Sequence, residues 1–108
     1  MLAAASLLCS ASTILTVTPY YGSTCSGAPA QMSAITPTMS GLDSPLSFAS
    51  GGGCVPFNNG HDGFYGACGG AGSVTFNAFE GSGASSCSGY VTNAAKRMPT
   101  SFTDGQCW

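Results

Sequence analysis

The hydrophobic and polar positions of this chain alternate over short runs, as they do in β-strands. Residues 13–21 are dense in β-branched and aromatic side chains that partly alternate with polar ones, which predicts a strand. Comparable runs predict further short strands at 30–35, 46–48, 73–79 and 89–94. No run of about 10 residues has the spacing of an amphipathic helix, and 93–98 predicts one helical turn at most. The pattern therefore predicts an all-β fold with little or no helix.

The strand pattern occurs twice, because the second half of the chain contains an altered copy of the first. Residues 9–22 align with 68–81 without a gap, and a three-residue insertion in the second copy then restores the match. The matched positions include Cys9 with Cys68, Leu15 with Val74, Tyr20 with Phe79, and Cys25 with Cys87. A further cysteine closes each copy, at Cys54 and at Cys107. Similarity of this kind indicates a repeated structural unit.

These copies divide the chain into two three-cysteine repeats. The first repeat covers 1–55 and includes an N-terminal arm, and the second covers 68–108. Between them, 56–67 is rich in asparagine and glycine and is expected to be a junction loop. Because 108 residues are typical of one domain, the repeats are expected to share one compact unit. We expect a small disulfide-stapled β-sandwich built from the two repeats.

The six cysteines indicate a disulfide framework. So many cysteines in so short a chain are typical of secreted or cell-surface proteins, which fold in an oxidising compartment. No Cys-x-x-Cys pair occurs, so zinc-ribbon and thioredoxin-like sites have no support. Six cysteines allow fifteen pairings, and the sequence alone does not choose among them. If the repeats are equivalent, the symmetric choice joins Cys25 to Cys54, Cys87 to Cys107, and Cys9 to Cys68.

One segment resembles a known family. Residues 20–27 read Tyr-Tyr-Gly-Ser-Thr-Cys-Ser-Gly, which is similar to the aromatic-x4-aromatic-x-Gly signature of βγ-crystallin Greek keys, with cysteine replacing the second aromatic residue. The second copy departs from this signature, because three extra residues separate Phe79 from Cys87. The resemblance implies a two-unit β-sandwich. The calcium ligands of that family are absent from the matching positions, so calcium binding is not implied.

Ionised side chains are scarce. The chain has two Lys or Arg residues and four Asp or Glu residues, 6% of the total, with a formal net charge of −2. Two basic residues cannot neutralise several phosphates, which argues against nucleic acid or a polybasic membrane patch as the function. No apolar run reaches the roughly 18 residues of a membrane span. Surfaces with little charge tend to associate, so the composition favours a protein that assembles with copies of itself.

No group of residues indicates catalysis, a cofactor or a metal ion. His61 is the only histidine, and Asp62 is its neighbour in sequence rather than a partner placed by the fold. The four carboxylates lie far apart along the chain, each close to turn-forming residues, at Asp43, Asp62, Glu80 and Asp104. Glycine-rich 69–72 precedes a predicted strand and has no lysine, so it is not a phosphate-binding loop. We expect a protein that is not an enzyme.

The leading hypothesis is an extracellular structural protein that assembles into a filament, sheath or surface coat. Its uncharged N-terminal arm, from Met1 to about Ser12, is expected to pack on the next copy or to add a strand to it. The apolar residues expected to make this contact are Met1, Leu2, Leu7 and Leu8. The partner would be a second copy of the chain, in a head-to-tail contact.

The rival hypothesis is a monomeric secreted module or effector that recognises a glycan or another protein. Four residues of the junction loop would form its binding face: Phe57, His61, Phe64 and Tyr65. The loop aromatics also have a structural interpretation, as cover for one end of the sandwich. Ice binding is a third alternative, but the regular threonine spacing it would favour is missing. No Asn-x-Ser/Thr site occurs, whereas the exposed Ser and Thr residues permit O-linked sugar.

Overall fold

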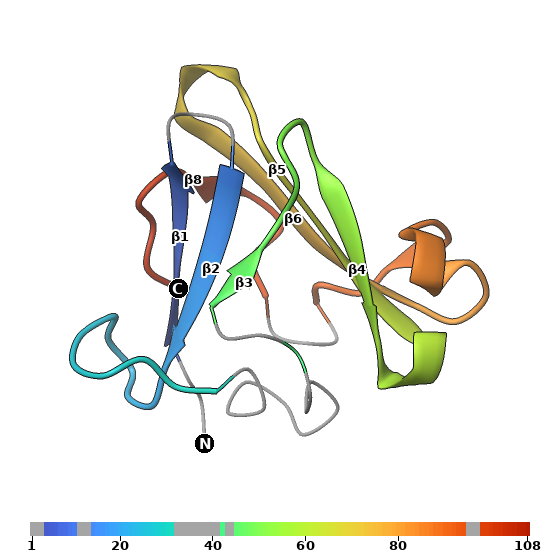
Figure 1. Cartoon of the computed structure of the whole chain (residues 1–108), viewed down its shortest axis with the longest axis horizontal. Helices are drawn as coiled ribbons and strands as arrows, with labels where there is room; N and C mark the ends of the chain where they lie inside the picture. Colours follow the sequence, from blue (N-terminus) through green and yellow to red (C-terminus); the bar gives the residue numbers. More distant parts are fainter. Residues whose placement is uncertain (1–3, 11–13, 32–41, 43–44, 95–97) are drawn as a thin grey trace.

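In the computed structural model, the chain folds into two antiparallel sheets (Figure 1). The structure describes residues 4–10, 14–31, 42, 45–94 and 98–108. The first sheet has the order β1-β2-β3, made of Ala4–Ser10, Ile14–Tyr20 and Leu46–Ser47. The second has the order β4-β5-β6-β7, with β8 also paired to β6, and is made of Gly53–Phe57, Asp62–Cys68, Ser73–Glu80, Tyr90–Val91 and Phe102–Thr103. Helical structure in the described residues is limited to short 3-10 turns, Asn58–Gly60, Gly70–Gly72 and Ala84–Ser86. The predicted all-β, disulfide-stapled fold is confirmed.

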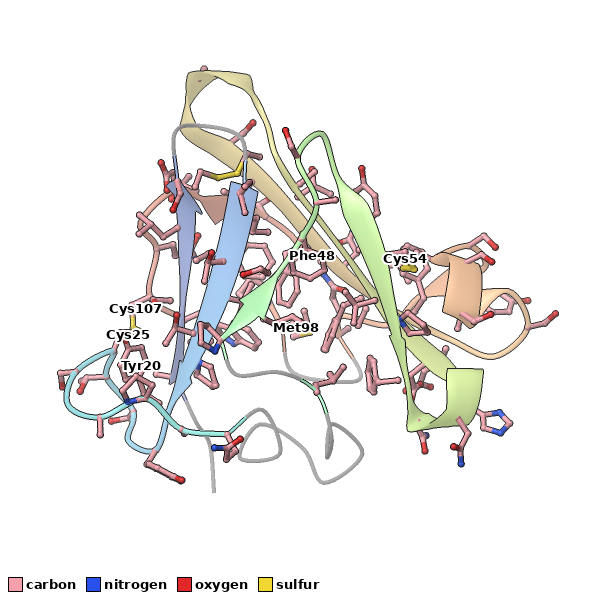
Figure 2. The ribbon with its side chains drawn as sticks, viewed as in Figure 1. Tyr20, Cys25, Phe48, Cys54, Met98 and Cys107 are labelled. Carbon is pink, nitrogen blue, oxygen red and sulfur yellow. A yellow bond between two sulfur atoms is a disulfide. The ribbon has the colours of Figure 1, made fainter. Side chains whose placement is uncertain are left out.

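The core lies between the sheets and follows from the alternation of the strands. On β2, Leu15 and Val17 are fully buried, while Thr16 between them is partly exposed. On β6, Val74 and Phe76 point the same way. Phenylalanine supplies much of the volume in a chain with few large aliphatic residues, and the rings meet in pairs: Phe57–Phe64, Phe64–Phe76, Phe48–Phe76 and Phe76–Phe102. Figure 2 shows Phe48 and Met98 directed into the space between the sheets.

The two repeats fold into equivalent hairpins. Cys9 and Cys68 are 59 residues apart. Adding 59 to both residue numbers of a β1–β2 pair gives a β5–β6 pair, and this holds for every pair from Ala4 to Cys9. Leu7 opposite Val17 thus becomes Gly66 opposite Phe76. The match continues beyond the hairpins. The bridge of Tyr20 to Pro29 corresponds to the pairing of Phe79 with Val91, with the three-residue insertion between them. The sequence repeat is therefore also a structural repeat.

Each repeat is completed by the closing strand of the other. Cys54 lies on β4 opposite Tyr65 of β5, and Cys107 lies opposite Ser6 of β1, the residue that corresponds to Tyr65. We call residues 105–108 the closing segment. It covers the free edge of β1 with four backbone hydrogen bonds: Ala5 N to Trp108 O (2.6 Å), Leu7 N to Gln106 O (3.0 Å), Gly105 N to Leu7 O (2.8 Å) and Trp108 N to Ala5 O (2.8 Å). In Figure 1 the C-terminus accordingly lies beside β1.

This exchange corrects two of the three expected disulfides. Cys9 and Cys68 pair as expected, but the other bridges are Cys25–Cys107 and Cys54–Cys87. The expected Cys25–Cys54 and Cys87–Cys107 bridges assumed that each repeat closes on itself. Because the closing strands lie on the opposite repeat, the cysteine of each repeat meets the closing cysteine of the other. The pairing is still symmetric, and all three bridges join one repeat to the other.

Several predicted element boundaries also need correction. The loop expected at 56–67 is shorter, because β4 runs to Phe57 and β5 begins at Asp62, which leaves residues 58–61 as the turn between them. Within the expected N-terminal arm, Ala4–Ser10 form an inner strand that lies between β2 and the closing segment. The strand expected at 89–94 shrinks to Tyr90–Val91, and at the start of the strand expected at 30–35 the structure has an isolated bridge of Pro29 to Tyr20. Residues 32–35 and 95–97, where a strand and a helical turn were expected, lie outside the described residues.

A buried asparagine joins β6 to the segment that follows β7. Asn93 is 1% exposed, and its Oδ1 accepts a hydrogen bond from the backbone N–H of Ala78 at 2.7 Å. Its Nδ2 donates to the carbonyl oxygens of Phe76 (3.3 Å) and Pro99 (2.9 Å). A further bond from Nδ2 reaches Oδ1 of Asn77 at 3.0 Å. The side-chain amide thus satisfies buried backbone groups that β7, with its two residues, does not reach.

Replacing Asn93 by alanine is expected to lower the free energy of unfolding by about 2 kcal/mol, because it leaves a buried N–H and buried carbonyls without partners. Gln31 is the matched control, since it is exposed and occupies the corresponding position of the first repeat. Chemical denaturation of the two alanine variants measures the difference. Equal stability of both variants would show that the Asn93 amide is not a structural link.

Candidate functional site

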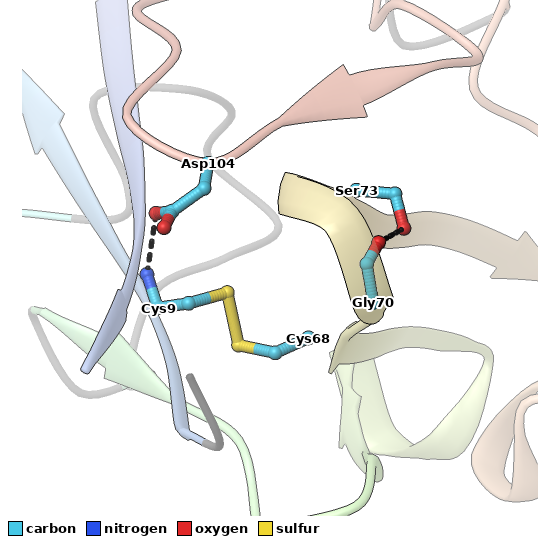
Figure 3. The surroundings of a disulfide bond; sticks show 5 residues. All are labelled: Cys9, Cys68, Gly70, Ser73 and Asp104. Carbon is cyan, nitrogen blue, oxygen red and sulfur yellow. Dashed lines mark hydrogen bonds between the residues drawn. A yellow bond between two sulfur atoms is a disulfide. The ribbon is translucent and has the colours of Figure 1, made fainter. Parts of the chain in front are cut away.

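A hollow of about 370 Å³ lies beside the Cys9–Cys68 disulfide. Figure 3 shows this disulfide with the neighbouring Gly70, Ser73 and Asp104. The β5–β6 turn and Asp104 complete its wall. Oδ1 of Asp104 accepts a hydrogen bond from the backbone N–H of Cys9 at 2.8 Å, and the Ser73 hydroxyl donates to Gly70 O at 2.9 Å. Among the described residues of the wall, Asp104 has the only ionisable side chain, and its carboxylate is bonded to the end of β1. The arrangement therefore fastens the first repeat to the second.

The predicted binding loop is divided between the core and the surface. Phe57 is 6% exposed and Phe64 1% exposed, and their rings stack at 4.7 Å between centroids. Both belong to the core and are unavailable as a sugar-stacking face. His61 is exposed in the turn, whereas Tyr65 is partly buried on the outer face of β5, where its ring covers Gly52. The four residues do not form one surface.

Asp62, the sequence neighbour of His61, is buried at the start of β5. It is 5% exposed, and its Oδ2 accepts a hydrogen bond from Nδ2 of Asn58 at 2.9 Å. Asn58 and Asn59 both have positive φ, so this bond holds a turn that only a few residue types adopt readily. Within the part of the chain that the structure describes, no three His, Cys, Asp or Glu side chains gather as metal ligands would.

The residues expected to form the assembly arm have different surroundings. Leu7 is fully buried against its own chain, whereas Leu8 is 54% exposed; Met1 and Leu2 lie outside the described residues. The hypothesis assumed that an exposed apolar arm needs a neighbouring copy to cover it. For Ala4–Ser10 this premise is wrong, because β2 and the closing segment of the same chain already flank the strand.

Of the five large hydrophobic side chains that are exposed in the described residues, four belong to strands of the two sheets, and the fifth, Tyr21, follows β2. Leu8 and Ile14 are 54% and 41% exposed, and the β1–β2 register places them diagonally across the strand pair on one face. We call these two residues the outer hairpin patch. On the second sheet, Tyr90 and Val91 of the edge strand β7 are 82% and 55% exposed. Sequence reasoning named Leu8 as an assembly residue but missed Ile14, Tyr90 and Val91, and it did not use the alternation along Ala4–Ser10, which places Leu8 on the face opposite to Leu7.

The described surface carries even less charge than the composition suggests. Of the three charged side chains among the described residues, Asp62 is buried and Asp104 is bonded to the Cys9 backbone. Glu80 is partly buried. Asp43, Lys96 and Arg97 lie outside the described residues. Electrostatic repulsion between copies is therefore weak over this part of the molecule.

The fold and its three bridges define the class of the protein as a disulfide-stapled β-sandwich made of two repeats. Comparison with protein-family models, with curated proteins and with solved structures finds no match. The similarity of residues 20–27 to βγ-crystallins thus has no support from these comparisons. Among the helices of the described residues, none is long and apolar enough to cross a membrane.

Proposed function

We propose that this protein is an extracellular structural protein that assembles with copies of itself into a filament, sheath or surface coat. The observation that carries the proposal is the outer hairpin patch. Leu8 and Ile14 are directed away from the core on a sheet face whose other described positions are uncharged. Contact with a second copy would remove this apolar area from water with little electrostatic cost.

The positions of the exposed apolar residues favour a head-to-tail contact. The outer hairpin patch belongs to the first sheet, and the Tyr90–Val91 edge belongs to the second. Two different surfaces that contact each other between copies give a heterologous interface, which continues into a filament when its rotation does not close. An exposed edge strand with apolar side chains is also a common site of strand pairing between chains.

The disulfides support a location outside the cell. Three bridges are consistent with an extracellular protein, because thiols are kept reduced in the cytosol. They also suit a structural role, since bridges that close 33, 59 and 82 residues restrict the unfolded chain strongly. A filament or coat subunit must stay folded without chaperones, and this framework would provide that resistance.

Replacing Leu8 and Ile14 together by asparagine is expected to weaken self-association at least tenfold, because the contact loses its apolar side chains and gains amides that need partners. Thr75→Asn is the matched control, since Thr75 is exposed on the outer face of the other sheet. Sedimentation velocity over a range of concentrations gives the association constants. A wild-type protein that stays monomeric at high concentration would refute the proposed function, and unchanged association of the double variant would refute this surface as the contact.

A further inference from the structure

The chain divides into two halves that meet through a self-contained interface. The first half contains β1, β2 and β3, and the second contains β4–β8 and the closing segment. Every strand pairing of the described residues lies within one half, except that of the closing segment with β1. Each half therefore keeps its own sheet if the two separate, while the β1 edge of the first half is left open.

Two disulfides, a ring contact in the core and one hydrogen bond also join the halves. Cys9–Cys68 and Cys25–Cys107 join the halves, and Cys54–Cys87 lies within the second. The Phe48 ring of the first half lies 5.8 Å from the Phe76 ring of the second, measured between centroids. The Asp104 carboxylate reaches the Cys9 backbone across the same interface. None of these contacts depends on which polypeptide supplies the partner half.

The backbone passes from one half to the other through a glycine-rich turn. Gly51 and Gly52 have φ of +83° and +110°, and Gly52 N bonds to Ala49 O at 3.0 Å. Phe48 and Phe102 occupy matching positions, opposite Leu15 and Val74 respectively. From Phe48 to Cys54 the chain is one residue longer than from Phe102 to Cys107, and three consecutive glycines, residues 51–53, lie in this connection. Glycine permits many backbone conformations, and this turn can open into an extended connection.

We propose that copies of this chain join by exchanging halves at the 49–53 turn, so that the first half of one copy pairs with the second half of another. This inference rests on the proposed function and supplies its joint. Reciprocal exchange closes a dimer, whereas exchange that is passed from copy to copy produces a linear chain. At every joint the closing segment of one copy covers β1 of the next.

The exchanged joint becomes covalent during oxidative folding. Cys9 of one copy bonds to Cys68 of another, and Cys25 bonds to Cys107 in the same way. Each new S–S bond releases two protons and two electrons, which reduce one glutathione disulfide to two glutathione thiols. The reciprocal dimer forms the same number of bridges per chain as the closed monomer, and a linear chain forms two fewer in all, at its ends, so neither needs additional oxidant. Cys54–Cys87 stays within one copy in both forms.

Isotope mixing tests the exchange on the full chain. Equal amounts of reduced ¹⁴N-labelled and ¹⁵N-labelled protein are folded together with glutathione disulfide, and the oligomers are separated by size and digested without reduction. Mass spectrometry then compares the three bridged peptides. We expect about half of the Cys9–Cys68 and Cys25–Cys107 peptides to carry both labels, as random pairing of copies requires, and the Cys54–Cys87 peptide to carry a single label. That last peptide is the internal control.

Three results would overturn the exchange of halves. Oligomers whose bridges all carry a single label would show non-covalent assembly of closed monomers, which leaves the proposed function intact. Label mixing in all three peptides would show indiscriminate oxidation. Folding to monomer alone would also exclude the exchange, while sedimentation of that native monomer still tests the proposed function separately.

The length of the turn provides a second test that does not depend on isotopes. Deleting Gly52 shortens the connection and is expected to raise the exchanged fraction several-fold, because a strained hinge favours the extended form. Inserting Gly-Ser-Gly after Gly52 is expected to lower it, because a longer connection lets the halves of one chain meet without strain. Non-reducing and reducing gels measure the fraction. Equal fractions in both variants would contradict this hinge.

Discussion

Replacing Cys25 and Cys107 together by serine is expected to lower the free energy of unfolding by about 4 kcal/mol. The bridge has a sequence separation of 82 residues, the largest of the three, so its loss restores the most conformational freedom to the unfolded chain. The bridge also holds the closing segment on β1. Without it, the closing segment keeps only non-covalent contacts, which include four backbone hydrogen bonds to β1 and the packing of Trp108 on Phe76 and Phe102, and a short terminal segment held in this way opens more readily.

Denaturation in guanidinium measures the loss of stability, and amide hydrogen exchange shows where it occurs. The N–H groups of Ala5 and Leu7, which donate to Trp108 and Gln106, should exchange much faster in the double variant. The control is the double variant Cys54→Ser with Cys87→Ser, which removes a bridge with a separation of 33 residues. We expect it to lower the free energy of unfolding less and to leave these two amides protected. A loss below about 1 kcal/mol in the Cys25 and Cys107 variant would contradict the loop-entropy argument.

The sequence predicts the parts of the fold that local patterns encode. β2 and β6 are the longest strands with β-branched and aromatic alternation, and both lie where that alternation places them. The gapless match of 9–22 to 68–81 falls on two hairpins of the same register. A hairpin depends on side-chain alternation and the length of its turn, and both are properties of neighbouring residues.

What the sequence does not predict depends on contacts between distant residues. β5 contains Gly63 and Gly66, which indicate a loop in isolation. In the structure, the Phe48 ring occupies the space beside Gly66 where a side chain would stand. The exchange of closing strands, and with it two of the disulfides, is likewise a property of the assembled repeats. The order of the cysteines, three in each repeat, fits closure within a repeat and closure across repeats equally well.

The candidate binding and assembly residues show the same contrast between what local patterns predict and what contacts between distant residues decide. Leu8 was chosen as an apolar residue of a free arm, and it is exposed because Ala4–Ser10 is a strand whose alternate residues face outward. Phe57 and Phe64 flank the turn, yet each belongs to a strand and points to the core. The distinction needs the register of β4 and β5, which no local pattern supplies.

Replacing Gly63 by alanine is expected to lower the free energy of unfolding by about 3 kcal/mol. A Cβ atom at Gly63 would collide with the carbonyl oxygen of Ala84, and it would lie 3.1 Å from the Ala84 carbonyl carbon and 3.3 Å from the Cys87 Sγ. The obstacle is backbone, and the Cys54–Cys87 bridge holds it in place. To make room for the Cβ atom, residues 81–87 would have to move together with β4, or the Cys54–Cys87 bridge and the Ala84–Ser86 turn would be distorted.

The corresponding position of the first repeat carries alanine, at Ala4. This difference follows from the three-residue insertion, because the extra residues form the turn Ala84–Ser86 that folds over β5. Gly70→Ala is the control, since a Cβ there meets nothing within 4 Å and its φ is not positive; its stability should stay within about 0.5 kcal/mol of wild type. Denaturation of both variants with the disulfides intact decides the matter. If Gly63→Ala were as stable as Gly70→Ala, the 81–87 loop would not be fixed against β5, and glycine at position 63 would need a different explanation.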